Sequence, residues 1–246
     1  MNNHIAIVTG GLGFIGTAIC VELCKLGATV IAVDKADQEI AANWQADQKK
    51  LGYNIGFSFA DITDLESTEK MIDDVESRFG PIGILVNNAG INRDSLFRKM
   101  SLEDWDTVIH TDLNGLFNIT RPLINKMCER KFGRIINISS VSAQIGQFGQ
   151  TNYVAAKAGV HGFSKALARE VAHYGITVNT ISPGFIDSNM VAKIPDNIKE
   201  EIIKQTPAGR FGKAEEIAWT VAFLASERSG FITGANVSVN GGIHMY

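Results

Sequence analysis

Three glycines near the N-terminus constrain the fold more than any other feature. Residues 5–8 are an apolar run typical of a buried strand, and Gly10, Gly13 and Gly16 follow at intervals of three. A helical pattern then continues to Lys25. Glycines between a strand and a helix let the backbone approach a pyrophosphate, and the helix N-terminus supplies N–H donors. The motif predicts a dinucleotide-binding unit, with a merely tight strand-to-helix turn as the alternative.

The remaining chain alternates strand and helix patterns. Further strands are predicted at 29–33, 54–59, 82–86, 134–138, 176–181 and 237–239, and helices at 65–79, 102–128, 153–172 and 215–225. This alternation predicts an α/β fold, a doubly wound parallel sheet of the Rossmann type with helices on both faces. Right-handed crossovers predict about seven strands in the order 3-2-1-4-5-6-7. With no repeat, low-complexity segment or linker, we expect one domain over residues 1–246.

Composition excludes several classes of function. A formal net charge of −3 gives no electrostatic reason to expect nucleic acid or an anionic membrane as partner. Three cysteines, Cys20, Cys24 and Cys128, make a disulfide framework unexpected, and no metal-ligating set is evident. There is no leader-like segment and no apolar run long enough to span a bilayer. We therefore expect a cytoplasmic protein.

Candidate catalytic residues follow the predicted strand at 134–138. Ser140 stands at the exit of that strand, while Tyr153 and Lys157 are four residues apart and share one face of the next helix. An ammonium beside a phenol stabilises the phenolate, which makes a tyrosine usable as a general acid or base. A serine hydroxyl can hold a carbonyl or alcohol oxygen beside it. The set suits reversible hydride transfer at a carbonyl.

The end of the second predicted strand bears on cofactor choice. Asp34 lies eighteen residues after Gly16, close to where a carboxylate accepts hydrogen bonds from the adenosine ribose hydroxyls. Such a carboxylate repels a 2′-phosphate, and the glycine loop has no Arg or Lys to neutralise one. Lys35 is a cation that could attract that phosphate. The sequence favours NAD(H) and leaves NADP(H) possible.

Taken together, the glycine motif and the Ser140, Tyr153 and Lys157 set resemble the short-chain dehydrogenase/reductase family, from Ile5 to the C-terminus. The resemblance implies that Ser140 polarises the substrate oxygen, Tyr153 donates the proton, and Lys157 assists Tyr153 and holds the nicotinamide ribose. It also implies a cofactor-binding set from the glycine loop, strand ends and following turns. These residues are Gly10, Leu12, Gly13, Phe14, Ile15, Gly16, Asp34, Lys35, Asp61, Ile62, Asn88, Ala89, Gly90, Tyr153, Lys157, Pro183, Gly184, Ile186 and Ser188.

Two positions depart from the family pattern. Phe14 stands where most members carry another glycine. In Thr111-Asp112-Leu113, Asp112 occupies the place of the Asn that completes the family's catalytic set. That Asn holds a proton-relay water largely through its backbone carbonyl, which Asp also offers, although a buried carboxylate shifts a pH profile.

Substrate class comes from resemblance. The segments at 93–100, 147–153 and 240–245 resemble acetoacetyl-CoA reductases, which make (R)-3-hydroxybutyryl-CoA for polyhydroxybutyrate. The resemblance implies that the thioester is bound by Asp94, Lys99, Ser140, Gln147, Phe148, Gln150 and Phe185.

Two alternatives stay open. The nearest is a 3-oxoacyl-(acyl-carrier-protein) reductase of fatty acid synthesis, which meets its acidic partner with basic residues on two helices. This chain has Lys131 at one such place and Tyr174 at the other. A non-catalytic dinucleotide sensor is the remote alternative, because a sensor has no need of Ser140, Tyr153 and Lys157 together. The family also implies a homotetramer.

Overall fold

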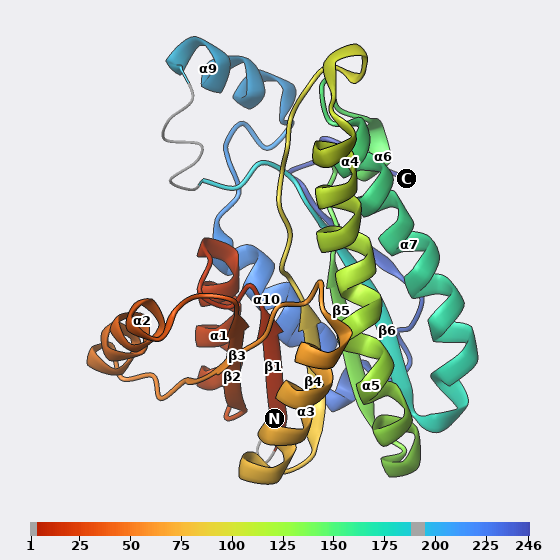
Figure 1. Cartoon of the computed structure of the whole chain (residues 1–246). Coiled ribbons are helices and arrows are strands. Elements are labelled where there is room, and N and C mark those ends of the chain that lie inside the picture. The colour runs from red at the N-terminus through yellow and green to blue at the C-terminus, as the bar shows by residue number, and fades with distance from the viewer. Residues whose placement is uncertain (1–3, 188–194) are drawn as a thin grey trace.

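One parallel sheet organises the molecule (Figure 1). The computed structural model describes residues 4–187 and 195–246. Within them the sheet has seven strands in the order β3-β2-β1-β4-β5-β6-β7, which confirms the predicted order. The strands are β1 (Ile5–Thr9), β2 (Thr29–Asp34), β3 (Gly56–Phe59), β4 (Ile82–Asn87), β5 (Gly133–Ile138), β6 (Ile176–Pro183) and β7 (Asn236–Val239).

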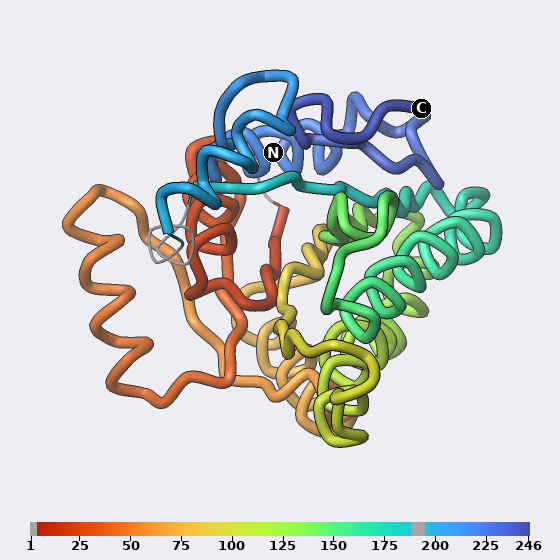
Figure 2. Tube along the Cα trace, turned by 90° about the horizontal axis from the view of Figure 1, so that it is seen from above, coloured from red at the N-terminus to blue at the C-terminus, as the bar shows by residue number. Residues whose placement is uncertain are grey.

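Helices cover both faces of the sheet. On one face lie α1 (Phe14–Lys25) and α10 (Ala214–Ala225), and on the other lie α3 (Leu65–Phe79), α5 (Gly115–Arg130) and α7 (Thr151–Val171). Figure 2 shows the two layers from above, on opposite sides of the strands. Helix α3 illustrates the local logic. Asp64 caps its first turn by accepting from the Glu66 N–H, Met71, Ile72 and Val75 form its buried stripe, and Gly80 ends it.

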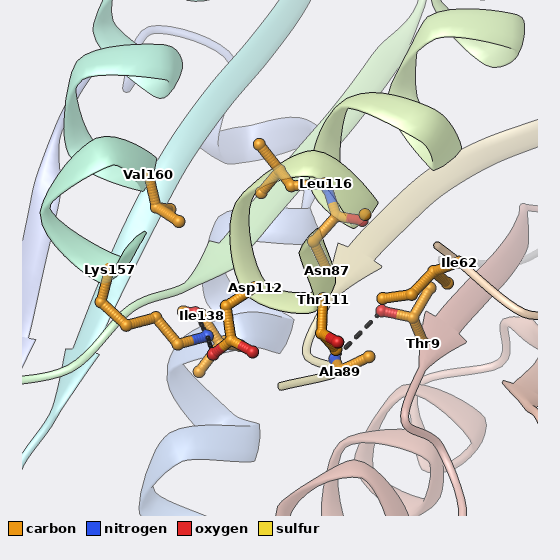
Figure 3. Close-up of a pocket in the computed structure, with 11 residues that line it drawn as sticks. Thr9, Ile62, Asn87, Ala89, Thr111, Asp112, Leu116, Ile138, Lys157 and Val160 are labelled. Carbon is orange, nitrogen blue, oxygen red and sulfur yellow. Dashed lines mark hydrogen bonds and ion pairs between the residues drawn. The ribbon is translucent and has the colours of Figure 1, made fainter. Parts of the chain in front are cut away.

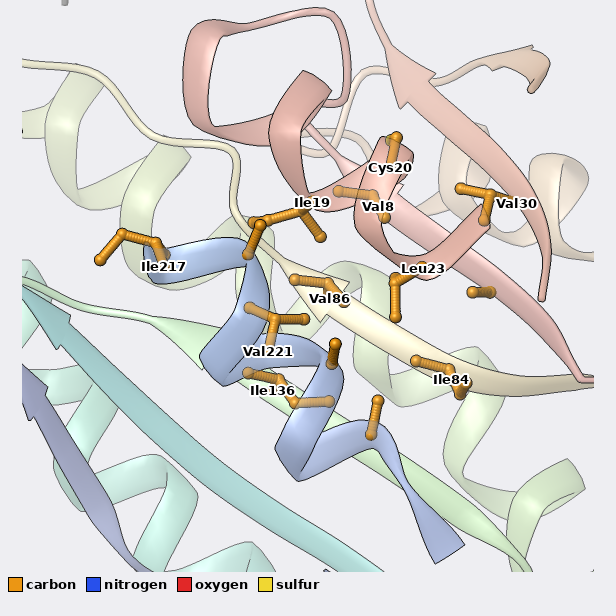
Figure 4. Close-up of a cluster of buried hydrophobic side chains, with 14 of the residues drawn as sticks. Val8, Ile19, Cys20, Leu23, Val30, Ile84, Val86, Ile136, Ile217 and Val221 are labelled. Carbon is orange, nitrogen blue, oxygen red and sulfur yellow. The ribbon is translucent and has the colours of Figure 1, made fainter. Parts of the chain in front are cut away.

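The two faces carry two apolar cores. Val8, Val86 and Ile136 of the strands pack against Leu23 of α1 and Val221 of α10 (Figure 4). Strands β1, β4, β5 and β6 are buried along their whole length, as expected for a parallel sheet covered on both sides. Burial on both faces fixes the register of these strands.

Several elements were not predicted. These are α2 (Gln38–Lys50), the one-turn α6 (Ser142–Ile145), α9 (Asp196–Gln205) and the 3-10 segments Phe97–Lys99, Ala172–Tyr174 and Glu227–Ser229. The predicted long helix at 102–128 is α4 (Leu102–Ile109) followed by a π turn, His110–Asn114, and α5. A π turn inserts one residue into the helical repeat and turns the side chains around it.

The sheet brings the candidate site to one edge. Because all strands run parallel, Thr9, Asp34, Asn87, Ile138 and Pro183 end on the same side. Ligands of doubly wound sheets bind there, outside the carboxyl ends of the strands. Among residues 4–187 and 195–246, no helix is long and apolar enough to cross a membrane.

Candidate active site

Helix α7 places Tyr153 and Lys157 on one face, as their spacing predicts. The Lys157 ammonium lies 5.7 Å from the centroid of the Tyr153 ring. Lys157 is buried, and its Nζ donates a hydrogen bond to the Ile138 carbonyl at 3.2 Å. Tyr153 is half-buried. A positive charge held this close stabilises a phenolate, so the pair is suited to proton exchange with a substrate oxygen.

Asp112 completes this arrangement from the π turn. Its Oδ2 lies 3.2 Å from Lys157 Nζ, and the two side chains are 0% and 5% exposed. The contact is an ion pair rather than an aligned hydrogen bond. Figure 3 shows the lysine reaching across from α7 toward the carboxylate. Burial by itself lowers the pKa of Lys157, but the charges of Asp112 and Tyr153 outweigh it and raise that pKa above its usual value.

Ser140 lies in the loop after β5. Its hydroxyl accepts from the Ser142 N–H at 3.1 Å, at the start of α6. Neighbouring Ser139 donates to the Lys157 carbonyl at 2.9 Å, which ties the end of β5 to α7. Within the described part of the chain, no hydrogen bond joins the Ser140 hydroxyl directly to Tyr153.

The glycine loop leaves no space for side chains. A Cβ on Gly16 would lie 2.1 Å from the Gly10 carbonyl oxygen, and one on Gly10 would lie 2.9 Å from the Ala89 Cα. Gly10 also has φ +60°, a conformation that favours glycine. Helix α1 begins after Gly13 without a side-chain cap and without an acidic residue in its first turn. Its N–H donors therefore suit a phosphate, and this cradle fits a dinucleotide.

The other predicted residues of this loop divide between core and surface. Leu12 and Ile15 pack against the core of the α1 face, whereas Phe14 is half exposed. Phe14 thus stands beside the cradle, where the resemblance implies contact with the cofactor.

At the end of β2, Asp34 and Lys35 have separate partners. The Asp34 carboxylate accepts from the Lys35 backbone N–H at 2.8 Å, while the Lys35 ammonium lies 3.9 Å from Asp61. Burial raises the pKa of Asp61, but hydrogen bonds from Thr63 and the charge of Lys35 hold it below its usual value. The ammonium is thus drawn to Asp61 rather than to Asp34.

The turn after β4 is fixed to the glycine loop. Asn88 donates through Nδ2 to the carbonyls of Thr9 and Gly10 at 3.0 and 3.1 Å, and Thr9 Oγ1 accepts from the N–H groups of Asn88 and Ala89. Ile62, after β3, packs against Gly115 where a Cβ would be 2.7 Å away. Thr9, Ile62 and Ala89 line one cavity, so residues that follow three different strands lie close together.

Comparisons with known proteins place the chain. Residues 13–244 match the profile of a family described as enoyl-(acyl carrier protein) reductase. The chain is 51% identical to the acetoacetyl-CoA reductase of Cupriavidus necator over 245 residues, covering 100% of both chains. It is 45% identical over 248 residues to the 3-oxoacyl-(acyl-carrier-protein) reductase FabG of Haemophilus influenzae, again covering 100% of both. The chain belongs to the short-chain dehydrogenase/reductase family.

A comparison with solved structures also finds a chain with this fold. The solved structure of gox2181 superposes with a TM-score of 0.94 at 33% identity, over 99% of this chain and 96% of that one. As predicted, this short-chain dehydrogenase/reductase is an NAD(P)-dependent oxidoreductase.

Of the residues implied to bind substrate, Asp94 and Gln150 meet. Gln150 Nε2 donates to Asp94 Oδ2 at 2.9 Å, and the Ser95 N–H donates to the Gly149 carbonyl at 2.8 Å. Phe148, in the same loop, is 86% exposed. The two loops implied to bind substrate are therefore tied to each other. Gln147 and Lys99 are also exposed, and no hydrogen bond between described residues brings their side chains to Tyr153.

The loop after β6 lines a separate cavity. Gly184, Phe185 and Ile186 line a cavity of about 70 Å³, and the Val141 N–H donates to the Pro183 carbonyl beside Ser140. Ile186 is buried and bridges to Gly212. Nearby, the Arg210 guanidinium and the Lys213 N–H bind Glu216, which lowers its pKa to about 2. Ser188, implied to bind the cofactor, lies outside the described residues.

Sequence reasoning missed part of the site. The Ile91 N–H donates to Asp112 Oδ1 at 2.8 Å, and a Cβ on Gly90 would lie 2.8 Å from Asp112 Oδ2 and 2.9 Å from Lys157 Nζ. The sequence named both Gly90 and Asp112, but nothing in it indicated that they meet. No group of three or more His, Cys, Asp or Glu side chains that could hold a metal occurs in the described ranges.

Proposed function

We propose that this enzyme reduces the 3-oxo group of acetoacetyl-CoA to give (R)-3-hydroxybutyryl-CoA. One observation carries the proposal: the buried Lys157 ammonium sits 5.7 Å from the Tyr153 ring at the carboxyl edge of the sheet. The end-to-end identity of 51% with a protein named acetoacetyl-CoA reductase supports the choice of substrate.

In this proposal Tyr153 acts as the general acid. Its phenol donates a proton to the carbonyl oxygen as negative charge develops there, and the Ser140 hydroxyl donates a hydrogen bond to the same oxygen. Lys157 stabilises the phenolate that Tyr153 becomes. Donors already aimed at that oxygen stabilise the transition state more than the ground state, which is what accelerates the reaction.

The glycine loop and the start of α1 would hold the cofactor's pyrophosphate, and Asn88, Ala89 and Pro183 would border it. When bound, the nicotinamide supplies the hydride. Lys157 has three donors, of which one is bonded to Ile138, so a free donor would hold the nicotinamide ribose.

We further propose that NAD(H) is preferred over NADP(H). Lys35 is engaged 3.9 Å from Asp61, so its ammonium is not directed at Asp34, whose carboxylate then disfavours a 2′-phosphate. The first turn of α1 offers no Lys or Arg to offset that charge.

Initial rates with acetoacetyl-CoA, using NADH and NADPH in parallel, test both proposals. We expect turnover with a higher kcat/KM for NADH. The matched measurement uses acetoacetyl-carrier protein, and a higher kcat/KM with that substrate would favour the alternative reductase. Absence of turnover with both thioesters, in protein that still binds NADH, would contradict the proposed function and favour the sensor.

Assembly and location are also proposals. Trp219 and Phe223 of α10 stack at 6.2 Å and, with Phe231, are exposed apolar side chains, which supports burial against other copies in a homotetramer. A monomeric mass in light scattering would contradict it. Three free cysteines are consistent with a reducing compartment and hence with the cytoplasm.

A further inference from the structure

The ion pair between Asp112 and Lys157 is the most buried pair of opposite charges in the described part of the chain (Figure 3). Few charged side chains are fully buried without a partner, because desolvation of a charge is costly. Removal of one side chain from an exposed salt bridge usually changes stability little. Removal of one side chain from a buried pair leaves the other charge buried without a partner.

Asp112 is held independently of the lysine. Its Oδ1 accepts the Ile91 backbone N–H at 2.8 Å, and the π turn His110–Asn114 carries the residue toward the site. Gly90 leaves the room that the two charged groups occupy, since any side chain there would begin within 2.9 Å of both. The carboxylate is therefore a fixed point against which the long lysine side chain is placed.

The surroundings contain few other ionisable groups. A cavity of about 10 Å³, about the space of one water, borders the pair, and its polar lining besides the pair consists of the neutral Thr9, Asn87 and Thr111. From α7 the phenol of Tyr153 faces Lys157. Among described residues, the ionisable groups facing Lys157 are thus Asp112 on the π turn and Tyr153 on its own helix.

We propose that Asp112 is a positioning residue whose side-chain carboxylate fixes the Lys157 ammonium and keeps it protonated in the dry interior. Asn at this position offers a side chain without charge, so this device belongs to Asp112. The role in turnover rests on the proposed function, whereas the role in holding the ammonium does not.

The physical reason is charge balance. Burial is the largest influence on the pKa of Lys157, and without the carboxylate only the charge of Tyr153 opposes it, so we expect that pKa to fall below its usual value. In the wild-type protein Lys157 stays protonated in both folded and unfolded states up to its ordinary pKa of 10.5, so it adds no pH dependence between pH 7 and 10. In Asp112→Asn the unfolded state binds the proton more tightly than the folded state, so stability rises with pH over that range.

Urea unfolding of the full chain at pH 7, 8, 9 and 10 tests this without substrate or cofactor. We expect Asp112→Asn to be less stable than wild type at pH 7, and the gap between them to narrow with pH, by up to about tenfold in the unfolding constant per pH unit. Asp106→Asn, which neutralises an exposed carboxylate of α4, is the matched control and should show no narrowing. A gap that is constant with pH would overturn the proposal.

A double variant tests the same proposal without relying on Asp112→Asn alone. When Asp112→Asn is combined with Lys157→Met, neither charge of the pair remains. The difference in stability from wild type should then no longer change with pH, and a difference that still narrows with pH would overturn the proposal. If Asp112→Asn does not fold, Lys157→Met alone is compared with the double variant. We expect the double variant to be the more stable at neutral pH, because Lys157→Met alone leaves Asp112 unpaired; the reverse order would overturn the proposal.

Activity gives the second readout. In Asp112→Asn, Lys157 should lose its proton at a lower pH, so the basic limb of the pH profile of kcat/KM for acetoacetyl-CoA reduction should move at least one pH unit toward acid. The effect on kcat should be larger than the effect on KM. An unchanged profile in a folded variant would overturn the catalytic part of the proposal. If the wild-type chain reduces no 3-oxoacyl thioester, the proposed function fails, and the unfolding measurements still decide the role of Asp112.

Discussion

The inner and outer halves of the site are built in opposite ways. Inside, Lys157 and Asp112 are 5% and 0% exposed and anchored by backbone groups of Ile138 and Ile91. Outside, Phe148 is 86% exposed, and its loop is held by the hydrogen bond from Gln150 to Asp94 and that from Ser95 to Gly149. Proton transfer depends on sub-ångström placement, whereas contact with a flexible thioester does not. Activity should therefore be sensitive to the loss of a single atom in the inner half, and only to the loss of a whole side chain in the outer half.

The largest expected effect is in the inner half. Tyr153→Phe removes one oxygen, and we expect kcat to fall by about 10² to 10⁴, the usual contribution of a general acid. NADH binding, measured by fluorescence titration, should be retained because the ring remains. Near-normal turnover would show that another group supplies the proton.

The second-largest effect is expected in the glycine loop, where the backbone passes close to Gly16. In Gly16→Ala the new Cβ would lie 2.1 Å from a backbone oxygen, so we expect a loss of stability of about 1–3 kcal/mol in urea unfolding, and weaker NADH binding. Gly13→Ala is the control, since its Cβ would meet the same oxygen at 3.2 Å. Equal effects of the two substitutions would argue against this close approach.

A charge at the end of β2, outside both halves, should tune the cofactor. Asp34→Asn removes the carboxylate proposed to disfavour a 2′-phosphate, and we expect the ratio of kcat/KM for NADH over NADPH to fall about tenfold, or about 1.4 kcal/mol. Asp37→Asn is the control, because Asp37 is an exposed N-cap of α2 and Asn caps equally well. A ratio that does not change would remove Asp34 from cofactor selection.

The smallest effect is expected in the outer half. Phe148→Ala should raise KM for acetoacetyl-CoA by a few-fold with little change in kcat, because we expect the exposed ring to contact substrate rather than reacting atoms. The free energy of unfolding should stay within about 0.5 kcal/mol of wild type. A large loss of kcat would mean that the outer half also positions the chemistry.

Sequence predicted the elements that bury regular apolar patterns. Helix 65–79 and the strand order are as predicted, because their patterns report burial directly. Helix α2 was missed because Ala41 and Gln48 are its buried residues, so its apolar stripe is weak. The π turn left no periodic signal, since it is one irregular turn within a long helical pattern.

Within the candidate site, the sequence predicted contacts along one element but not those between elements. The spacing of Tyr153 and Lys157 follows from helix geometry, whereas the Asp112–Lys157 pair joins two segments whose separation only the folded sheet defines. Likewise, Lys35 lies next to Asp34 in the chain, but its ammonium is nearest to Asp61, which follows β3. Local spacing predicts contacts along one element, and contacts between elements need the fold.

The packing of α1 against α10 has a consequence for synthesis of the chain. The apolar face of α1, with Ile19 and Leu23, is covered by Ile217 and Val221 of α10, almost 200 residues later (Figure 4). A nascent chain therefore carries its first helix uncovered until α10 leaves the ribosome, and β1 gains its second neighbour only once β4 has been made. The glycine loop is made early, but the helix that follows it is covered only once residues 214–225 have been made, so a chain that stops before residue 214 leaves this apolar face exposed.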